Sequence, residues 1–340
     1  MTTSDETSGD VEPPRRSTRR RKVLIIATLI VLLPLAAAFA LVMQRQWVYD
    51  GNIRRVQQVF PEEGDRPAKV VGEAQNWLVI GADRRPGEAG FQRSDSIMIA
   101  HIPADRKKVF VIGVPRDSYV TIPGHGKDKI NAAYAFGGPK LLIRTVEKLT
   151  GVRIDHFAAL DFNGFVTMSK ALGGVDIYVE REVHDPMNDV TWPQGNVHLE
   201  GERALLFVRQ RYNLPGGDFD RIKRQQAFLR AMGEKAISKG TLTDPLALDA
   251  FLQALTKSIT VDSGVTIGTL RDLALELRDV RGGDLMSATV PVKGTGMVKG
   301  ASIVRLDPAA CARLFAAIRN DTLETHLADF GGENDTSLVR

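Results

Sequence analysis

The chain has 340 residues, of which 43% are hydrophobic and 25% charged, an ordinary composition for a globular protein. A formal net charge of +4 is too small to favour nucleic acid as a partner, and an aromatic content of 6% offers no platform for stacking bases. The single cysteine, Cys311, excludes an internal disulfide and a thiolate metal cluster, and it fits export to an oxidising compartment.

An uncharged apolar segment runs from Val23 to Met43, and its 21 residues would span about 31 Å as a helix. Because this length matches the hydrocarbon core of a bilayer, we expect one transmembrane helix. Arginines crowd its N-terminal side, so the positive-inside rule puts residues 1–22 in the cytoplasm, as a disordered tail. The rest of the chain is expected to be extracellular.

A cleaved signal peptide is the main alternative for this segment. The apolar region of a signal peptide is about 7–15 residues long, which is shorter than the run found here. Apolar residues 41–43 also follow the small residues of AAAFA directly. A DNA-binding arm is the alternative for the arginines, but membrane topology accounts for them. We therefore expect an uncleaved anchor in the cell membrane.

Residues 44–340 fall into three parts. Residues 44–73 are polar and contain two prolines, which indicates an extracytoplasmic stalk with one helical stretch near Ile53–Phe60. A catalytic domain is expected over residues 74–322, and a flexible tail over 323–340.

Strands and helices alternate along the globular part without a repeat period. Apolar β-rich runs predict strands at 77–80, 96–102, 109–114, 157–162, 175–179 and 285–290. Helix-forming runs, several bounded by proline or glycine, predict helices at 139–150, 164–172, 201–207, 220–238, 245–258, 266–278 and 308–319. This alternation predicts an α/β or α+β fold, in which helices cover a central sheet that is mixed or mostly antiparallel.

Charged residues lie at the ends of the first three predicted strands. Asp83 follows the first strand, Asp95 precedes the second, and Arg116 follows the third; Arg93 lies in the loop between the first two. If these strands form an antiparallel meander, the three strand ends meet at one end of the sheet. The sequence therefore predicts a charged site there, in which Asp117 orients Arg116 through a salt bridge.

A second group of polar side chains comes mainly from the segment LLFVRQRYNLPGGDFDRIKRQQ. Two of its arginines are two residues apart, so an extended backbone would point them the same way. Three further side chains share one face of the helix expected after the glycine-rich loop. These residues, with one lysine from KDKINAAY, are Arg209, Arg211, Arg221, Arg224, Gln225 and Lys129.

Arginine stays charged and forms paired hydrogen bonds to phosphate oxygens. Carboxylates repel phosphate unless a cation lies between them, and Mg²⁺ binds one or two carboxylates together with substrate phosphates. The two groups therefore predict a pyrophosphate site with Mg²⁺ between Asp83 and Asp95, suited to phosphoryl transfer. Solvated salt bridges, which contribute little, remain the alternative for any single pair.

These residues resemble the motifs of the LytR-CpsA-Psr family of cell-wall glycopolymer ligases. The resemblance covers about residues 74–235 and continues less distinctly to about 320. The motifs that carry it are, in chain order, NWLVIGADRR, RSDSIMI, VPRDSYV, KINAAYAFGG, LDFNGFVTMSKALGGVDIYV, LEGERALLFVRQR and GDFDRIKRQQ. An exported domain on a membrane anchor also agrees with this family.

The resemblance implies a phosphotransferase that moves a glycopolymer from a polyprenyl-pyrophosphate carrier to peptidoglycan with Mg²⁺, with pyrophosphate hydrolysis as a side activity. Asp83 and Asp95 would hold the metal. The phosphates would be contacted by Arg93, Arg116, Lys129, Arg209, Arg211, Arg221, Arg224 and Gln225. Among these side chains we expect Arg116, Arg209, Arg211 and Asp95 to be catalytic. Asp220 stands where the family usually has a small residue.

The resemblance also implies a hydrophobic tunnel for the lipid between the sheet and the helices. Large apolar residues near the motifs are candidates for its wall, although each is equally suited to an ordinary core. These candidates are Phe136, Leu142, Phe157, Phe162, Phe165 and Phe207.

Two functions without catalysis are the alternatives. A polyprenyl-phosphate-binding scaffold of the same fold would keep the arginines but would not need both carboxylates. A transcriptional attenuator of cell-envelope genes conflicts with the expected topology, because the 22 residues assigned to the cytoplasm hold no helix-turn-helix.

Overall fold

The computed structural model describes residues 40, 43–82, 94–236, 244–330 and 338–339. The chain divides into two units, residues 1–48 and 49–340. The transmembrane helix expected at Val23–Met43 lies outside the described residues, apart from Ala40 and Met43. Within the described ranges, no helix combines the length and the apolar character needed to cross a bilayer.

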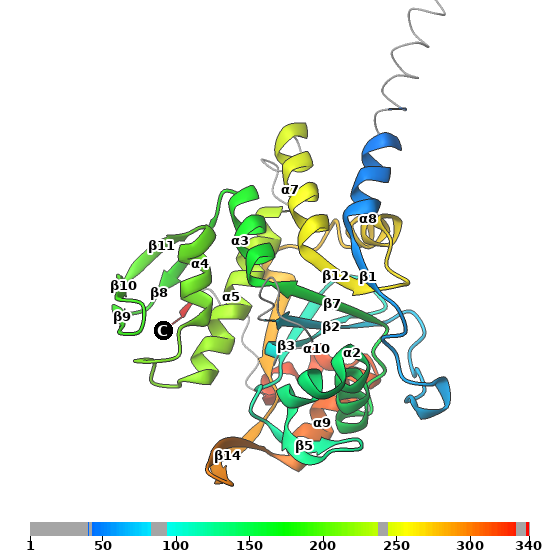
Figure 1. Ribbon diagram of the computed structural model, residues 1–340, viewed down its shortest axis with the longest axis vertical. Helices are drawn as coiled ribbons and strands as arrows, with labels where there is room; N and C mark the ends of the chain where they lie inside the picture. The colour runs from blue at the N-terminus through cyan, green and yellow to red at the C-terminus, as the bar shows by residue number, and fades with distance from the viewer. Residues whose placement is uncertain (1–39, 41–42, 83–93, 237–243, 331–337, 340) are drawn as a thin grey trace, which may run out of the picture. The chain divides into compact units, whose positions relative to one another are not determined.

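A seven-stranded sheet in the order β1-β12-β7-β2-β3-β4-β13 forms the centre of the second unit (Figure 1). Its strands are β1 (Arg54–Val56), β2 (Gln75–Ala82), β3 (Ser94–Ile102), β4 (Val109–Gly113), β7 (His156–Asp161), β12 (Ile259–Asp262) and β13 (Leu285–Thr289). The antiparallel pairs β2–β3 and β3–β4 confirm the predicted meander. Because β2–β7, β4–β13 and β1–β12 are parallel, the sheet is mixed rather than mostly antiparallel.

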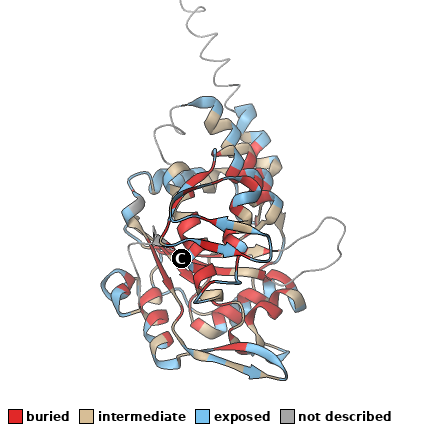
Figure 2. Cartoon of the chain, turned by 90° about the vertical axis from the view of Figure 1, so that its left-hand side faces the viewer, coloured by how far each residue is buried: buried red, intermediate tan, exposed pale blue. Residues whose placement is uncertain are grey.

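One face of this sheet packs against α2 (Ile130–Thr150) and α9 (Pro308–Arg319). Successive side chains of a strand point to opposite faces, so Leu78 and Ile80 of β2 lie on this side together with Ile99 of β3. Burial of each such side chain contributes about 1.5–3 kcal/mol, which makes this face the main anchor of the sheet. Figure 2 shows the buried residues concentrated in the strands and in the helix faces toward them.

The opposite face of the sheet carries Val79 and Met98 and is covered by two groups of helices. One group consists of α3 (Phe162–Ala171), α4 (Gly201–Arg209), α5 (Asp218–Ala236) and α7 (Pro245–Ser258). It packs with β8 (Val175–Val179) and β11 (Gly195–Leu199) into a separate apolar cluster around Trp192, Phe207 and Phe228. The other group is α8 (Ile267–Glu276), which packs near β12. In Figure 1, α3, α4 and α5 lie apart from α2, α9 and α10 (Leu323–His326).

The remaining strands form small sheets and hairpins at the edges of the fold. They pair as β5 with β6, β8 with β11 and β16, β9 with β10, and β14 with β15. Their bounds are β5 (Tyr119–Ile122), β6 (Gly126–Lys129), β8 (Val175–Val179), β9 (Val183–Asp185), β10 (Val190–Trp192), β11 (Gly195–Leu199), β14 (Val292–Val298), β15 (Ala301–Leu306) and β16 (Leu338–Val339).

Helix bounds follow capping chemistry where the sequence displays it. The helices predicted at 245–258 and 308–319 are confirmed, because each has proline in its first turn and a preceding aspartate that accepts backbone N–H groups. The helix predicted from residue 139 begins at Ile130 instead, with a break at Gly137 and Gly138. The helical stretch predicted near Ile53–Phe60 is wrong, since residues 54–56 pair with β12 as strand β1.

Helix α5 lies unusually close to the sheet. The side-chain amide of Gln226 donates to the carbonyl oxygens of Val111 (3.2 Å) and Ala288 (2.8 Å), and so joins α5 to β4 and β13. A Cβ added to Gly113 would lie only 2.6 Å from Cγ2 of Ile222 on α5. Glycine is therefore required at this position by the close approach of the helix.

We expect Gly113→Ala to lower the free energy of unfolding by about 1–3 kcal/mol, the usual effect of overpacking a core. Thermal unfolding followed by circular dichroism would measure the change. Gly72→Ala is the matched control, because a Cβ at exposed Gly72 meets no atom within 4 Å. Equal melting temperatures for the two variants would show that α5 can move away from β4 at no cost.

Candidate active site

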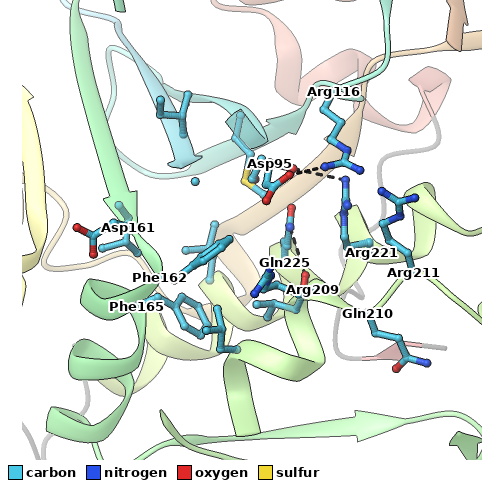
Figure 3. A pocket seen from close by; sticks show the side chains of 18 of the residues that line it. Asp95, Arg116, Asp161, Phe162, Phe165, Arg209, Gln210, Arg211, Arg221 and Gln225 are labelled. Atoms are coloured by element: carbon cyan, nitrogen blue, oxygen red, sulfur yellow. Dashed lines mark hydrogen bonds and ion pairs between the residues drawn. The ribbon is translucent and has the colours of Figure 1, made fainter. Parts of the chain in front are cut away.

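A cavity of about 310 Å³ lies between the second face of the sheet and helices α3, α4 and α5. Its apolar wall comes from the strands and from all three helices, and its charged wall lies at the strand ends. Figure 3 shows Phe162 and Phe165 on one side of Asp95, and Arg116, Arg211 and Arg221 on the other. The apolar lining includes Val79, Met98, Leu160, Phe162, Phe165, Leu205, Val208 and Leu229.

The direction of the strands explains why charged residues meet here. Strand β3 runs opposite to β2, β4 and β7, so its first residues lie beside the last residues of those strands. Asp95 at the start of β3 consequently pairs with Arg116, which follows β4. At the end of β7, Asp161 also lines the cavity and caps α3 by accepting the N–H of Gly164 at 2.7 Å. The predicted convergence of Asp95 and Arg116 at one end of the sheet is therefore confirmed.

Two arginines and two aspartates form an alternating network at the charged wall. Arg116 pairs with Asp95, and its Nε lies 3.8 Å from Oδ1 of Asp218. The same Oδ1 lies 2.5 Å from Nη2 of Arg221, which also donates to the backbone oxygen of Asp95 at 3.4 Å. Asp218 is not among the site residues predicted from the sequence. Its spacing of three residues from Arg221 on a helix was the available signal for this pair.

Arg221 is buried at the cavity wall, with 5% of its side chain exposed. Burial lowers its pKa to about 10 despite the opposing effect of Asp218, so the guanidinium stays charged at neutral pH. The Nε groups of Arg221 and Arg116 are buried and find no hydrogen-bond acceptor among the described residues. An unsatisfied buried donor costs about 1–3 kcal/mol, so hydrogen bonding at this charged wall is incomplete.

Arg209 and Arg211 both line the cavity and are exposed, whereas Gln210 between them is buried. The prediction of an extended backbone is wrong at Arg209, because this residue is the last of α4. Gln210 leaves the helical conformation, with φ −57° and ψ 136°. The guanidinium of Arg209 lies 4.1 Å above the centre of the Phe162 ring. Within the described ranges neither arginine pairs with a carboxylate, so both charges can serve an anionic ligand.

The other predicted site residues have different surroundings. Gln225 lines the cavity and donates to the carbonyl oxygen of Val208 at 3.3 Å. Lys129 lies outside the lining and pairs with Asp117 at 2.9 Å, so the prediction that Asp117 orients Arg116 is wrong. Arg224 is fully buried and also lies outside the lining. Asp83 and Arg93 are outside the described residues.

Of the six apolar candidates for a tunnel wall, Phe162 and Phe165 line the cavity. Leu142 and Phe157 belong to the core on the other face of the sheet, and Phe207 to the core of the helical cluster. The sixth, Phe136, is 49% exposed and stacks on a histidine ring.

The predicted Mg²⁺ site requires carboxylate ligands at the cavity. Asp95 is a carboxylate on the cavity wall, and 27% of its side chain is exposed. No group of three or more potential ligands occurs among the described residues. Mg²⁺ commonly takes one or two carboxylates and completes its shell with phosphate oxygens and water. Asp95 therefore fits this ion in the presence of a phosphate ligand.

The LytR_cpsA_psr family model matches residues 51–320. The chain belongs to the LytR-CpsA-Psr family. Among its relatives, the probable cell wall biosynthesis protein LcpB of Corynebacterium glutamicum is 35% identical over 300 residues, which are 84% of this chain and 69% of LcpB. The cell wall biosynthesis protein LcpA of the same organism is 33% identical over 252 residues, which are 66% of this chain and 48% of LcpA.

Solved structures have the same fold. TagT of B. subtilis superposes with a TM-score of 0.62 at 22% identity, covering 77% of this chain and 99% of TagT. The LytR-Csp2A-Psr enzyme from Actinomyces oris gives a TM-score of 0.63 at 22% identity, covering 78% of this chain and 95% of that enzyme. The family resemblance of the sequence motifs is confirmed by the family model and by the relatives of similar sequence.

We expect Asp218→Asn to destabilise the protein by about 1–3 kcal/mol, because it leaves the buried charge of Arg221 without its nearest carboxylate. Urea unfolding at neutral pH would measure the difference. Asp176→Asn is the control, since Asp176 is 72% exposed and pairs with a histidine. A loss no greater than that of the control would mean that Asp218 does not stabilise Arg221.

Proposed function

We propose that the protein is a phosphotransferase that moves a glycopolymer from a polyprenyl-pyrophosphate carrier to peptidoglycan. The observation that carries this proposal is a cavity with an apolar wall and arginines at one end. A lipid pyrophosphate has the same division, since its chain is apolar and its head carries several negative charges.

Each half of the cavity suits one half of that ligand. Phe162, Phe165 and Leu205 can contact the first isoprene units, because burial of apolar surface favours binding by roughly 25 cal/mol per Å². Arg209 and Arg211 can form paired hydrogen bonds with phosphate oxygens. The solved structure of TagT bound to LI-WTA has a TM-score of 0.63 to this chain at 23% identity, which supports a ligand at this fold.

In the proposed reaction, a hydroxyl oxygen of the wall sugar forms a bond to the phosphorus that carries the glycan. The bond from this phosphorus to the bridging oxygen breaks, and polyprenyl phosphate leaves with the electron pair. The hydroxyl proton passes to a base or to water. Arg116 and Arg221 would stabilise the charge that develops on the phosphate oxygens, and fixed positive groups of this kind supply much of the rate of phosphoryl transfer.

We also propose Asp95 as a ligand of Mg²⁺, with Asp83 as the second carboxylate. When bound, the ion would neutralise phosphate charge and make the phosphorus more electrophilic. Arg116 would orient the Asp95 carboxylate, because the two side chains form an ion pair.

The proposed location is the cell membrane, with the N-terminus in the cytoplasm and the catalytic unit outside. Val23–Met43 would be the anchor, since its length and flanking arginines suit a single span. An anchored enzyme would stay at the surface in which its lipid donor is dissolved, and close to its peptidoglycan acceptor.

We expect the full-length protein in detergent to cleave a short polyprenyl pyrophosphate in the presence of Mg²⁺, and Arg116→Ala to abolish the reaction. Phosphate release with metal and with chelator would measure this. Arg271→Ala is the control, because Arg271 lies on α8 and pairs only with neighbouring Asp272 among the described residues. Tight lipid binding without cleavage, in the presence of a glycan-bearing donor and peptidoglycan, would instead favour the scaffold function.

Asp95→Asn is expected to raise the Mg²⁺ concentration needed for half-maximal turnover by about tenfold or more, because it removes a charged metal ligand. A metal titration of the cleavage reaction would show the shift. Asp117→Asn serves as the control, since Asp117 pairs with Lys129 outside the cavity lining. Superimposable titration curves for Asp95→Asn and the wild type would exclude Asp95 from the metal site.

A further inference from the structure

Arg224 belongs to the family motif GDFDRIKRQQ but does not line the cavity. It lies on α5 three residues after Arg221 and is 0% exposed. Its guanidinium lies 4.2 Å above the centre of the Phe207 ring. Its Nη1 donates to Oε1 of Gln210 at 2.7 Å, with a longer contact of 3.5 Å to the backbone oxygen of Phe207. The side chain therefore contacts the end of α4.

Gln210 is held at three points. Its Oε1 accepts from Arg224 and also from the indole N–H of Trp192, both at 2.7 Å. Its Nε2 donates to the backbone oxygen of Tyr212 at 3.0 Å. Because guanidinium and indole groups are donors only, the amide oxygen must face them, and the amide cannot turn over.

The position of Gln210 in the chain gives this network a consequence for the cavity. Gln210 stands between Arg209 and Arg211 and also borders the cavity, but its side chain is buried while both arginines are exposed. In Figure 3 its side chain points away from Asp95. Gln210 follows directly after α4, so holding its side chain also fixes the stretch of backbone from which Arg209 and Arg211 extend.

A buried cation is tolerated here because negative groups surround it. The last carbonyl groups of α4 carry the negative end of the helix dipole, and Phe207 supplies one of them. Burial lowers the pKa of Arg224 to about 10, while the nearby charges of Asp220 and Asp185 favour its charged form. Asp220 is the departure from the family pattern noted in the sequence, and its Oδ2 accepts the N–H of Gly216 at 2.7 Å.

We propose that Arg224 is a positioning residue, which acts through Gln210 to hold Arg209 and Arg211 in the orientation that binds the phosphates. It would not contact the phosphates itself, in contrast to the role that the sequence motif suggested. This inference rests on the proposed function of the cavity, because it assumes that the two exposed arginines bind a phosphorylated ligand.

A double-mutant cycle with inorganic pyrophosphate as the probe tests this role. We expect Arg224→Met to weaken pyrophosphate binding by about tenfold or more in the wild-type background, the scale of a lost charge-assisted hydrogen bond. In a background carrying Arg209→Ala and Arg211→Ala, the same substitution should have no further effect, because the residues it positions are absent. Isothermal titration calorimetry on the full-length protein would measure all four affinities.

Two results would overturn the proposal. Equal weakening in both backgrounds would mean that the charge of Arg224 acts on the ligand directly, and unchanged affinity in the wild-type background would mean that the network is dispensable. Arg230→Met is the control, because Arg230 lies on the same helix and pairs with Glu234. If Arg224→Met fails to fold, Trp192→Phe removes the other donor to Gln210 and should give a smaller loss with the same dependence on background.

A ligand-free measurement separates this inference from the proposed function. The side chains of Arg209 and Arg211 should be more mobile in Arg224→Met than in Arg230→Met, whether or not pyrophosphate binds. NMR relaxation of their side-chain signals would measure this. A wild-type protein that fails to bind pyrophosphate would count against the proposed function alone. Unchanged mobility of both arginines would overturn the positioning role.

Discussion

The close packing of α5 against β4 and β13 determines where the charged groups of the cavity lie. Gln226 joins the helix to two strands, and Gly113 leaves room for Ile222. With the helix fixed, Arg221 and Gln225 face the cavity at the ends of the strands. A shift of the helix by the width of a methyl group would move both side chains relative to Asp95, which is fixed by the sheet.

Charge balance is the second constraint on this region. Arg116 and Arg221 share Asp95 and Asp218, whereas Arg209 and Arg211 have no carboxylate partner among the described residues. The two aspartates balance the charges of Arg116 and Arg221, so the protein can hold these arginines at the cavity wall without a ligand. Arg209 and Arg211 are exposed to water, so their charges destabilise the ligand-free protein little. The wall thus combines a fixed part with a part that is free to bind.

Arg221 and Arg224 show how one motif serves two purposes. They are separated by three residues on α5, yet Arg221 faces the charged end of the cavity and Arg224 faces the end of α4. Membership of the LytR-CpsA-Psr family relates the whole motif to cell-wall biosynthesis. The packing distinguishes the side chains that can touch a ligand from the one that supports its neighbours.

Local signals were enough to predict where most of the central strands and helices lie along the chain, because apolar periodicity and end-capping residues act over a few positions. They were also enough to predict the convergence of Asp95 and Arg116, since an antiparallel meander brings those strand ends together. Only the folded packing established that Arg54–Val56 is a strand, that Asp117 pairs with Lys129, and that Arg224 is buried. These outcomes depend on partners distant in the chain, or on which face of a helix meets the core, and local sequence patterns do not encode either.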